Sequence, residues 1–169
     1  MAKESKEIPV VSIVGESDTG KTTLIEKIIP ELTRRGYRVA TVKHDVHGFD
    51  IDHEGKDSWR HKQAGACLTV LSSPWRVAVV EDVEKDHDIV ELRDRYIRNV
   101  DIIVTEGFKR NSHPKIEVFR ADRNGDLISR GDENLLAVAG DKPPQVHVPW
   151  FDGNDVVGIV NLIEARFLS

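Results

Sequence analysis

Apolar runs alternate with amphipathic stretches along most of the chain, and this pattern predicts strands separated by helices. Residues 8–14, 100–107 and 135–139 are apolar at most positions, which is typical of strands that are covered on both faces of a sheet. Residues 37–42 form a further predicted strand after the first helix. Strands that alternate with helices favour an α/β domain with a mainly parallel sheet.

The first predicted helix carries its apolar side chains on one broad face: Leu24, Ile25, Ile28, Ile29 and Leu32. Pro30 lies inside this pattern, where it removes a backbone donor, so we expect a kink or an early end there. Gly36 is the expected C-terminal cap. Further helices are predicted over residues 57–66, 89–97 and 155–167, the last with these inward-facing side chains: Val156, Ile159, Val160, Ile163 and Phe167.

Two β-hairpins are predicted in addition to the parallel strands. Residues 68–71 and 75–80 read as strands joined at a Ser-Ser-Pro turn. Residues 115–120 and 126–129 flank Asn124–Gly125, and Asn-Gly is a strong signal for a hairpin turn. These hairpins are expected either at the edge of the sheet or in a dimerisation element.

Composition limits the class of protein. The 24 basic and 29 acidic residues give a formal net charge of −5, which argues against binding a nucleic-acid backbone, since that needs a basic face. Cys67 is the only cysteine, so no internal disulfide can form and a thiolate zinc site is disfavoured. The N-terminus lacks the apolar core of a signal peptide and no stretch reaches membrane-spanning length. We therefore expect a cytoplasmic protein with no membrane partner, folded as one domain over residues 1–169 with residues 1–7 as a flexible tail.

The most informative motif is GESDTGKT, from Gly15 to Thr22. It fits G-x-x-x-x-G-K-[ST], follows a buried strand and opens a helix, which predicts a three-layer P-loop NTPase fold. The glycines let successive amides point at one anion, the lysine reaches the β- and γ-phosphates, and the hydroxyl binds Mg²⁺. A glycine turn that merely joins strand to helix would need neither the lysine nor the hydroxyl. The predicted nucleotide contacts here are Gly15, Asp18, Thr19, Gly20, Lys21, Thr22 and Thr23.

Two further acids follow buried strands. Glu106 ends the strand over residues 100–107, where such folds place the acid that reaches Mg²⁺, so Thr22 and Glu106 are the predicted metal ligands. Asp141 comes just after residues 135–139, at the sheet edge where ligands bind. Its carboxylate could accept from both donors of the guanine edge and so favour GTP over ATP. The alternative is a solvated aspartate in a turn.

A loop rich in histidine and acidic residues follows the second strand. Four of the seven histidines lie there, among five acids: His44, His47, His53, His61, Asp45, Asp50, Asp52, Glu54 and Asp57. One reading is a transition-metal site of imidazole and carboxylate. A second is a polar loop beside the nucleotide. A third is a switch-like loop in which Asp50 or Asp52 orients an attacking water, with Lys21 as the other catalytic residue.

A basic loop, GFKRNSHPK, follows Glu106. Its Lys109 could bind a second phosphate or an acidic surface of a partner, and a simple solvated loop is the alternative.

Taken together, these motifs resemble the molybdopterin-guanine dinucleotide biosynthesis protein B (MobB) family, from about residue 8 to the last helix. The most specific features are Lys43–His44 followed by His47, Asp50 and Asp52, the segment GKDSWRHKQAGA over residues 55–66, and EGFKR after the fourth strand. The sequence departs from the expected pattern at Glu16 and Asp18, which put two acids inside the phosphate loop.

The resemblance implies a GTP-binding accessory protein for the guanylyltransferase that joins GMP to molybdopterin. It also implies a homodimer with weak, Mg²⁺-dependent GTPase activity. His44, His47, Asp50 and Asp52 would line the site beside the γ-phosphate or the pterin, with molybdopterin as a second ligand. The competing hypotheses are a small-molecule kinase, although a lid with several arginines is not evident, and a metallochaperone-type GTPase that uses the histidine loop.

Overall fold

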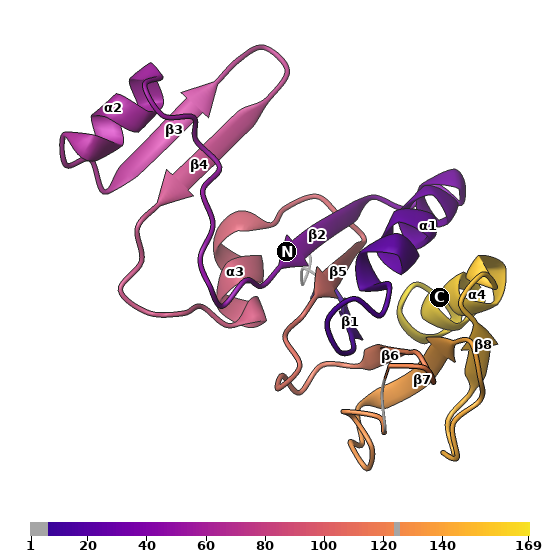
Figure 1. Cartoon of the computed structure of the whole chain (residues 1–169). Coiled ribbons are helices and arrows are strands. Elements are labelled where there is room, and N and C mark those ends of the chain that lie inside the picture. Colours follow the sequence, from indigo (N-terminus) through magenta and orange to yellow (C-terminus); the bar gives the residue numbers. More distant parts are fainter. Residues whose placement is uncertain (1–6, 124–125) are drawn as a thin grey trace. The chain divides into compact units, whose positions relative to one another are not determined.

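The computed structural model describes residues 7–123 and 126–169. The chain forms two compact units (Figure 1), of which the smaller is Asp45–Ile89 and the larger combines residues up to His44 with Val90–Ser169. The assignment of residues 1–169 to one domain stays a prediction.

The larger unit contains a six-stranded sheet with the order β2-β5-β1-β6-β7-β8. Every neighbouring pair of strands is parallel. The strands are β1 (Val10–Val14), β2 (Val39–Lys43), β5 (Ile102–Glu106), β6 (Lys115–Phe119), β7 (Leu135–Gly140) and β8 (Trp150–Asp152). In a parallel sheet all carboxyl ends lie at one edge, so the loops that leave these strands gather there.

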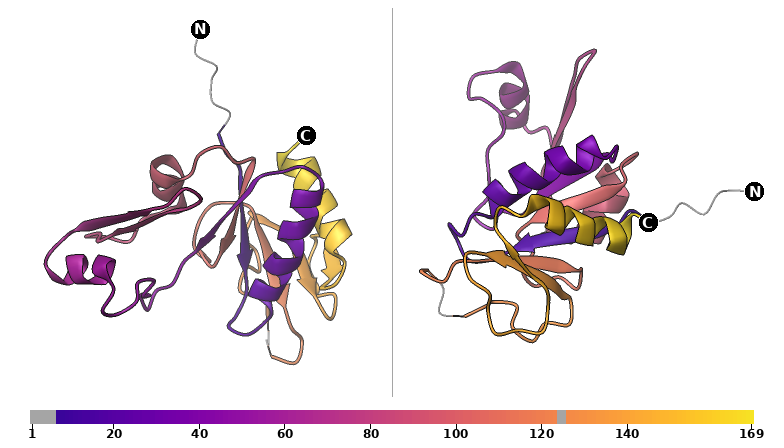
Figure 2. Two further views of the ribbon diagram at one scale, coloured as in Figure 1. Left: turned by 90° about the horizontal axis from the view of Figure 1, so that it is seen from above. Right: turned by 90° about the vertical axis from the view of Figure 1, so that its right-hand side faces the viewer.

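Two helices cover one face of the sheet. They are α1 (Lys21–Arg34) and α4 (Val156–Phe167), drawn in indigo and yellow and lying side by side in both views of Figure 2. The main core lies between these helices and the strands, and its fully buried members include Val11, Ile13, Ile28, Leu32, Ile102, Val104, Ile116, Ala137, Ile159 and Ile163. The apolar periodicity of both helices therefore matches their packing.

The other face of the sheet is covered as well, since every residue of β1 is buried and successive side chains of a strand point to opposite faces. A smaller core cluster consists of Leu127, Leu135 and Val138, with partly buried Val146 and Trp150 packed against it. The predicted α/β class with a parallel sheet is confirmed. The remaining helix, α3, spans Ile89–Tyr96.

The smaller unit consists of a helix and a two-stranded sheet. The helix α2 (Asp57–Gln63) precedes the antiparallel strands β3 (Leu68–Ser72) and β4 (Val77–Glu81). Leu68 pairs with Glu81 and Ser72 with Val77, so the first predicted hairpin is confirmed.

The second predicted hairpin is wrong. Lys115–Phe119 is a parallel strand between β1 and β7, and residues 126–129 form turns instead of a partner strand. The buried carboxylate of Glu117 explains this, because it accepts hydrogen bonds from the backbone N–H groups of Ile128 and Ser129 at 2.8 and 2.9 Å. Asn124–Gly125 lies outside the described residues.

Of the two outcomes expected at Pro30, a kink or an early end, the early end is excluded, because α1 continues to Arg34. Leu32 lies beyond the proline and is fully buried, so packing of the last turn outweighs the backbone hydrogen bond that proline cannot donate. The cap at Gly36 is confirmed. Gly36 has a positive φ of 93°, its N–H donates to Thr33, and the N–H of Tyr37 donates to Leu32, which is a Schellman motif.

The described part of the chain has no helix with the length and apolar character that membrane crossing requires.

Candidate functional site

The phosphate loop connects β1 to α1 at the carboxyl edge of the sheet. Gly15 begins it with a φ of 146°, and a Cβ there would lie 2.5 Å from the backbone oxygen of Val118 on β6. Asp18 adopts a positive φ of 58°, and Gly20, at φ 101°, caps the start of the helix. The loop therefore follows a path that needs glycine at its first position, and its backbone curls toward the helix N-terminus.

Two side chains close the loop on itself. The Lys21 ammonium donates to the backbone oxygen of Glu16 at 2.6 Å, and the Thr19 hydroxyl donates to the same oxygen at 3.0 Å. Burial lowers the pKa of Lys21 below its usual value, and the nearby Glu106 carboxylate opposes that shift. The ammonium is thus held across the loop, next to the space that an anion would enter.

Thr22 and Glu106 meet at the same edge. The Thr22 hydroxyl, at the start of α1, donates to Oε1 of Glu106, at the end of β5, over 2.9 Å. A cleft of about 480 Å³ adjoins them, lined by Ser17, Asp18, Gly20, Lys21, Thr22, Thr23, Lys43 and Glu106. Hydroxyl and carboxylate oxygens suit Mg²⁺, which usually keeps several waters and takes its remaining ligands from substrate phosphates. The two predicted metal ligands therefore fit such an ion.

His44 lies beside this pair, where the loop after β2 begins. Its backbone N–H donates to the backbone oxygen of Glu106 at 3.0 Å. Its ring stacks on that of Phe108, with the ring centroids 4.6 Å apart. Phe108 holds a positive φ of 54°, a conformation that bulky residues rarely adopt and that often marks functional sites. The start of the histidine loop thus shares the sheet edge with the phosphate loop.

Asp141 lies in a second cleft, of about 260 Å³, at the carboxyl ends of three strands. Residues from α1, from the ends of β6, β7 and β8 and from the adjoining loops line it: Thr19, Gly20, Thr23, Leu24, Lys27, Val118, Arg120, Ala139, Gly140, Asp141, Asp152, Gly153 and Asn154. Oδ1 of Asp141 accepts from the backbone N–H of Ala121 at 3.0 Å, and its Oδ2 lies 3.7 Å from Nε of Arg120. The hydrogen bond from Ala121 lowers the pKa of Asp141, so the carboxylate is charged at neutral pH. Gly20 and Thr23 line both clefts, which makes the two spaces neighbours.

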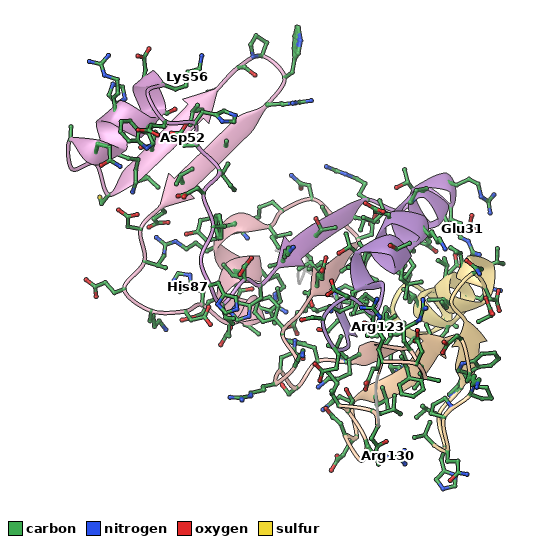
Figure 3. All side chains as sticks on the ribbon, in the orientation of Figure 1. Glu31, Asp52, Lys56, His87, Arg123 and Arg130 are labelled. Atoms are coloured by element: carbon green, nitrogen blue, oxygen red, sulfur yellow. The ribbon has the colours of Figure 1, made fainter. Side chains whose placement is uncertain are left out.

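The rest of the histidine-rich loop belongs to the smaller unit. There Oδ1 of Asp52 accepts from the hydroxyl of Ser58 at 2.9 Å, and Asp52 lies beside α2 (Figure 3). The backbone N–H of His47 donates to Asp45 at 3.1 Å, and Asp50 is exposed. In residues 7–123 and 126–169, no three His, Cys, Asp or Glu side chains gather closely enough to hold a metal ion.

Sequence reasoning missed most of the second cleft. Asp152 ends β8, a strand of three residues that was not predicted, and Gly153 and Asn154 follow it. Lys27 comes from the exposed side of α1, and its ammonium donates to Oδ1 of Asn154 at 2.8 Å. Two features of the sequence could have indicated this cleft: the Asp-Gly pair at residues 152–153, after a short apolar run, and the lysine at position 27 of the first helix. Neither feature is specific for a binding site unless the order of the strands is known.

Comparison with known proteins agrees with this arrangement. A molybdopterin-guanine dinucleotide biosynthesis adapter protein of Haemophilus influenzae is 38% identical over 161 residues, which cover 95% of this chain and 90% of the relative. A protein of the same description from Escherichia coli is 37% identical over 162 residues, covering 92% and 91% of the two chains.

A crystal structure of molybdopterin-guanine biosynthesis protein B superposes with a TM-score of 0.77 at 31% identity, covering 95% of this chain and 99% of that chain. The family model for molybdopterin guanine dinucleotide synthesis protein B matches residues 10–141. The resemblance found in the sequence motifs is thereby confirmed, and the chain belongs to the MobB family.

Proposed function

We propose that the protein is an adapter in molybdopterin-guanine dinucleotide biosynthesis and that it binds GTP with Mg²⁺ at the edge of its sheet. The observation that carries this proposal is the hydrogen bond of 2.9 Å between Thr22 and Glu106. Residues 84 positions apart bring a hydroxyl and a carboxylate together beside Lys21. A structural turn has no use for that combination, whereas a nucleotide with its metal uses all three groups.

The two neighbouring clefts support one extended ligand. The cleft at Lys21 would take the phosphates, and the cleft at Asp141 would take the base, with Gly20 and Thr23 between them. The base cleft is formed where β6, β7 and β8 end, which is the edge at which open α/β sheets bind ligands. Asp141 supports guanine there, because its charged carboxylate can accept from both donors of the guanine edge.

Slow hydrolysis fits the site better than fast turnover. Lys21 would stabilise charge on the transferring phosphate, and Asp50 or Asp52 would orient the attacking water. Neither an arginine finger nor a water-positioning glutamine is identifiable in the sequence motifs, so we expect a weak, Mg²⁺-dependent GTPase. His44 and His47, with those two aspartates, would bind molybdopterin as a second ligand.

The proposed partner is the guanylyltransferase that joins GMP to molybdopterin, and the proposed assembly is a homodimer. The net charge of −5 argues against a nucleic-acid partner.

Calorimetry with GTP and with ATP, each with Mg²⁺, tests the proposal, followed by phosphate release with and without the guanylyltransferase. We expect tight binding of GTP and slow release of phosphate, at a rate that the guanylyltransferase changes. Preference for ATP, or rapid transfer of phosphate to a small acceptor in the absence of the partner, would favour the kinase. Mass spectrometry of the products separates transfer from hydrolysis.

A further inference from the structure

The loop between β5 and β6, residues 107–114, is fixed from beneath by buried polar groups. The amide of Asn111 donates to the hydroxyl of Ser12 at 2.9 Å, and Ser12 is fully buried at the centre of the sheet. The ammonium of Lys115, only 1% exposed, donates to the backbone oxygen of Asn111 at 2.9 Å and to that of Lys109 at 3.4 Å. Asp132 balances its charge at 2.5 Å. The position of Lys109 is therefore set by the fold.

This anchored loop brings Lys109 to the phosphate loop. Its ammonium lies 3.7 Å from Oε2 of Glu16, the second residue of the GESDTGKT motif. Lys109 is also close enough to Lys21 to contribute to the lowered pKa of that residue. The ammonium groups of Lys21 and Lys109 and the carboxylate of Glu16 therefore lie at the phosphate loop, beside the cleft that Asp18 and Glu106 also line.

The negative charge of Glu16 affects the binding of any triphosphate at the phosphate loop. An unpaired carboxylate in the loop would repel the ligand, and the ion pair with Lys109 offsets that repulsion. Both side chains are about half exposed, at 46% and 50%, and ion pairs in water-exposed positions are weak. A doubly charged terminal phosphate is a stronger acceptor for an ammonium than a solvated carboxylate is. Lys109 can therefore exchange its ion pair with Glu16 for one with a terminal phosphate.

We propose that Lys109 distinguishes nucleoside triphosphates from diphosphates by leaving Glu16 for the γ-phosphate. The proposal rests on the proposed function, because it takes the phosphate loop as the nucleotide site. When a diphosphate is bound, Lys109 stays paired with Glu16. When a triphosphate is bound, Lys109 moves to its last phosphate, and residues 107–114 become tied to the nucleotide. The loop then reports the state of the nucleotide to a partner.

The test compares affinities for GDP and for a non-hydrolysable GTP analogue, both with Mg²⁺, by calorimetry. Lys109→Met should bind the triphosphate about tenfold more weakly, as expected for loss of one hydrogen bond to a charged group. It should weaken GDP binding much less, only through the repulsion from the Glu16 carboxylate that loses its partner. Arg110→Met is the matched control, since it removes the neighbouring exposed cation and should change neither affinity. Thermal melts establish that each variant is folded.

Glu16→Gln provides the complementary test. It should raise affinity for the triphosphate several-fold, because no carboxylate is left unpaired when Lys109 moves, and should change GDP affinity little. In the Lys109→Met variant, Glu16→Gln should raise the affinities for GDP and for the triphosphate by the same factor, because Glu16 has lost its Lys109 partner in both complexes. Hydrogen exchange should slow in residues 107–114 with the triphosphate and not with GDP.

Equal weakening of both nucleotides by Lys109→Met would overturn the inference, since Lys109 would then be a general attractor of anions. Unchanged binding of both nucleotides by that variant would overturn it as well. Lys21→Ala separates this failure from failure of the proposed function. If Lys21→Ala abolishes binding while Lys109→Met has no selective effect, the phosphate loop stands and only the role of Lys109 is wrong. If Lys21→Ala binds both nucleotides normally, both proposals are wrong.

Discussion

Replacing Gly15 by alanine tests the backbone geometry of the phosphate loop. The added Cβ would lie 2.5 Å from the oxygen of Val118 and 3.0 Å from the hydroxyl oxygen of Thr19, at a φ of 146°. The first contact is with the backbone of a buried strand, which cannot yield as the end of a flexible side chain would. The loop or β6 must therefore shift.

The size of the effect follows from two separate costs. An unfavourable backbone conformation for alanine costs about 1–3 kcal/mol, and crowding in a packed interior costs about 1–3 kcal/mol more. Gly20 is the matched control, because its φ is also positive, at 101°, but a Cβ there would meet nothing within 4 Å. Gly20→Ala should cost only the conformational part, about 1–2 kcal/mol.

The assay is thermal and urea unfolding of both variants beside the wild type. For a chain of 169 residues, each kcal/mol corresponds to about 2–4 °C in Tm. We expect Gly15→Ala to lose about twice as much stability as Gly20→Ala. Equal losses would show that the approach of Val118 to the loop does not constrain position 15, and the reasoning from that contact would be refuted.

Three further predictions concern other parts of the chain. Asp141→Asn should lower the preference for GTP over ATP about tenfold, measured by competition binding; an unchanged ratio would remove Asp141 from the base site. Glu31, on α1 (Figure 3), has its pKa lowered from 4.5 to about 2 by hydrogen bonds from the two arginines at the end of that helix. The unfolded chain therefore takes up this proton first, so stability is lost as the pH falls from about 4.5 toward 2. In urea melts across that range, Glu31→Gln should show a smaller loss than the wild type, and identical pH profiles would contradict the assignment. Asp155 caps α4 by accepting from the N–H of Gly158 at 2.9 Å, so Asp155→Ala should lower the free energy of unfolding by about 1 kcal/mol; a Tm equal to that of the wild type would refute the role of this cap.

The parts of the fold that the sequence predicted are those set by local pattern. β1, β5 and β7 are buried on both faces, so their apolar runs are unambiguous, and the motif from Gly15 to Thr22 carries its own chemistry. Glu106 could be identified because a parallel strand ends at the ligand edge of its sheet.

The parts that were missed depend on distant contacts. The strand β6 was taken for half of a hairpin because Asn124–Gly125 follows it, yet the Glu117 carboxylate holds the following segment away from strand pairing. The base cleft joins the ends of three strands to Lys27, and no local pattern reveals which strand ends are neighbours. The pairing of Glu16 with Lys109 likewise depends on the anchoring of a loop by residues on other elements.

The proposed function requires that the phosphate loop hold GTP through Lys21 and a magnesium ion at Thr22 and Glu106. Calorimetric titration of GTP with Mg²⁺ into the wild type and into Lys21→Ala tests it most directly, with circular dichroism to establish that the variant is folded. We expect saturable binding by the wild type and no measurable binding by a folded Lys21→Ala. A folded variant that binds GTP as tightly as the wild type would show that the phosphate loop is not the nucleotide site.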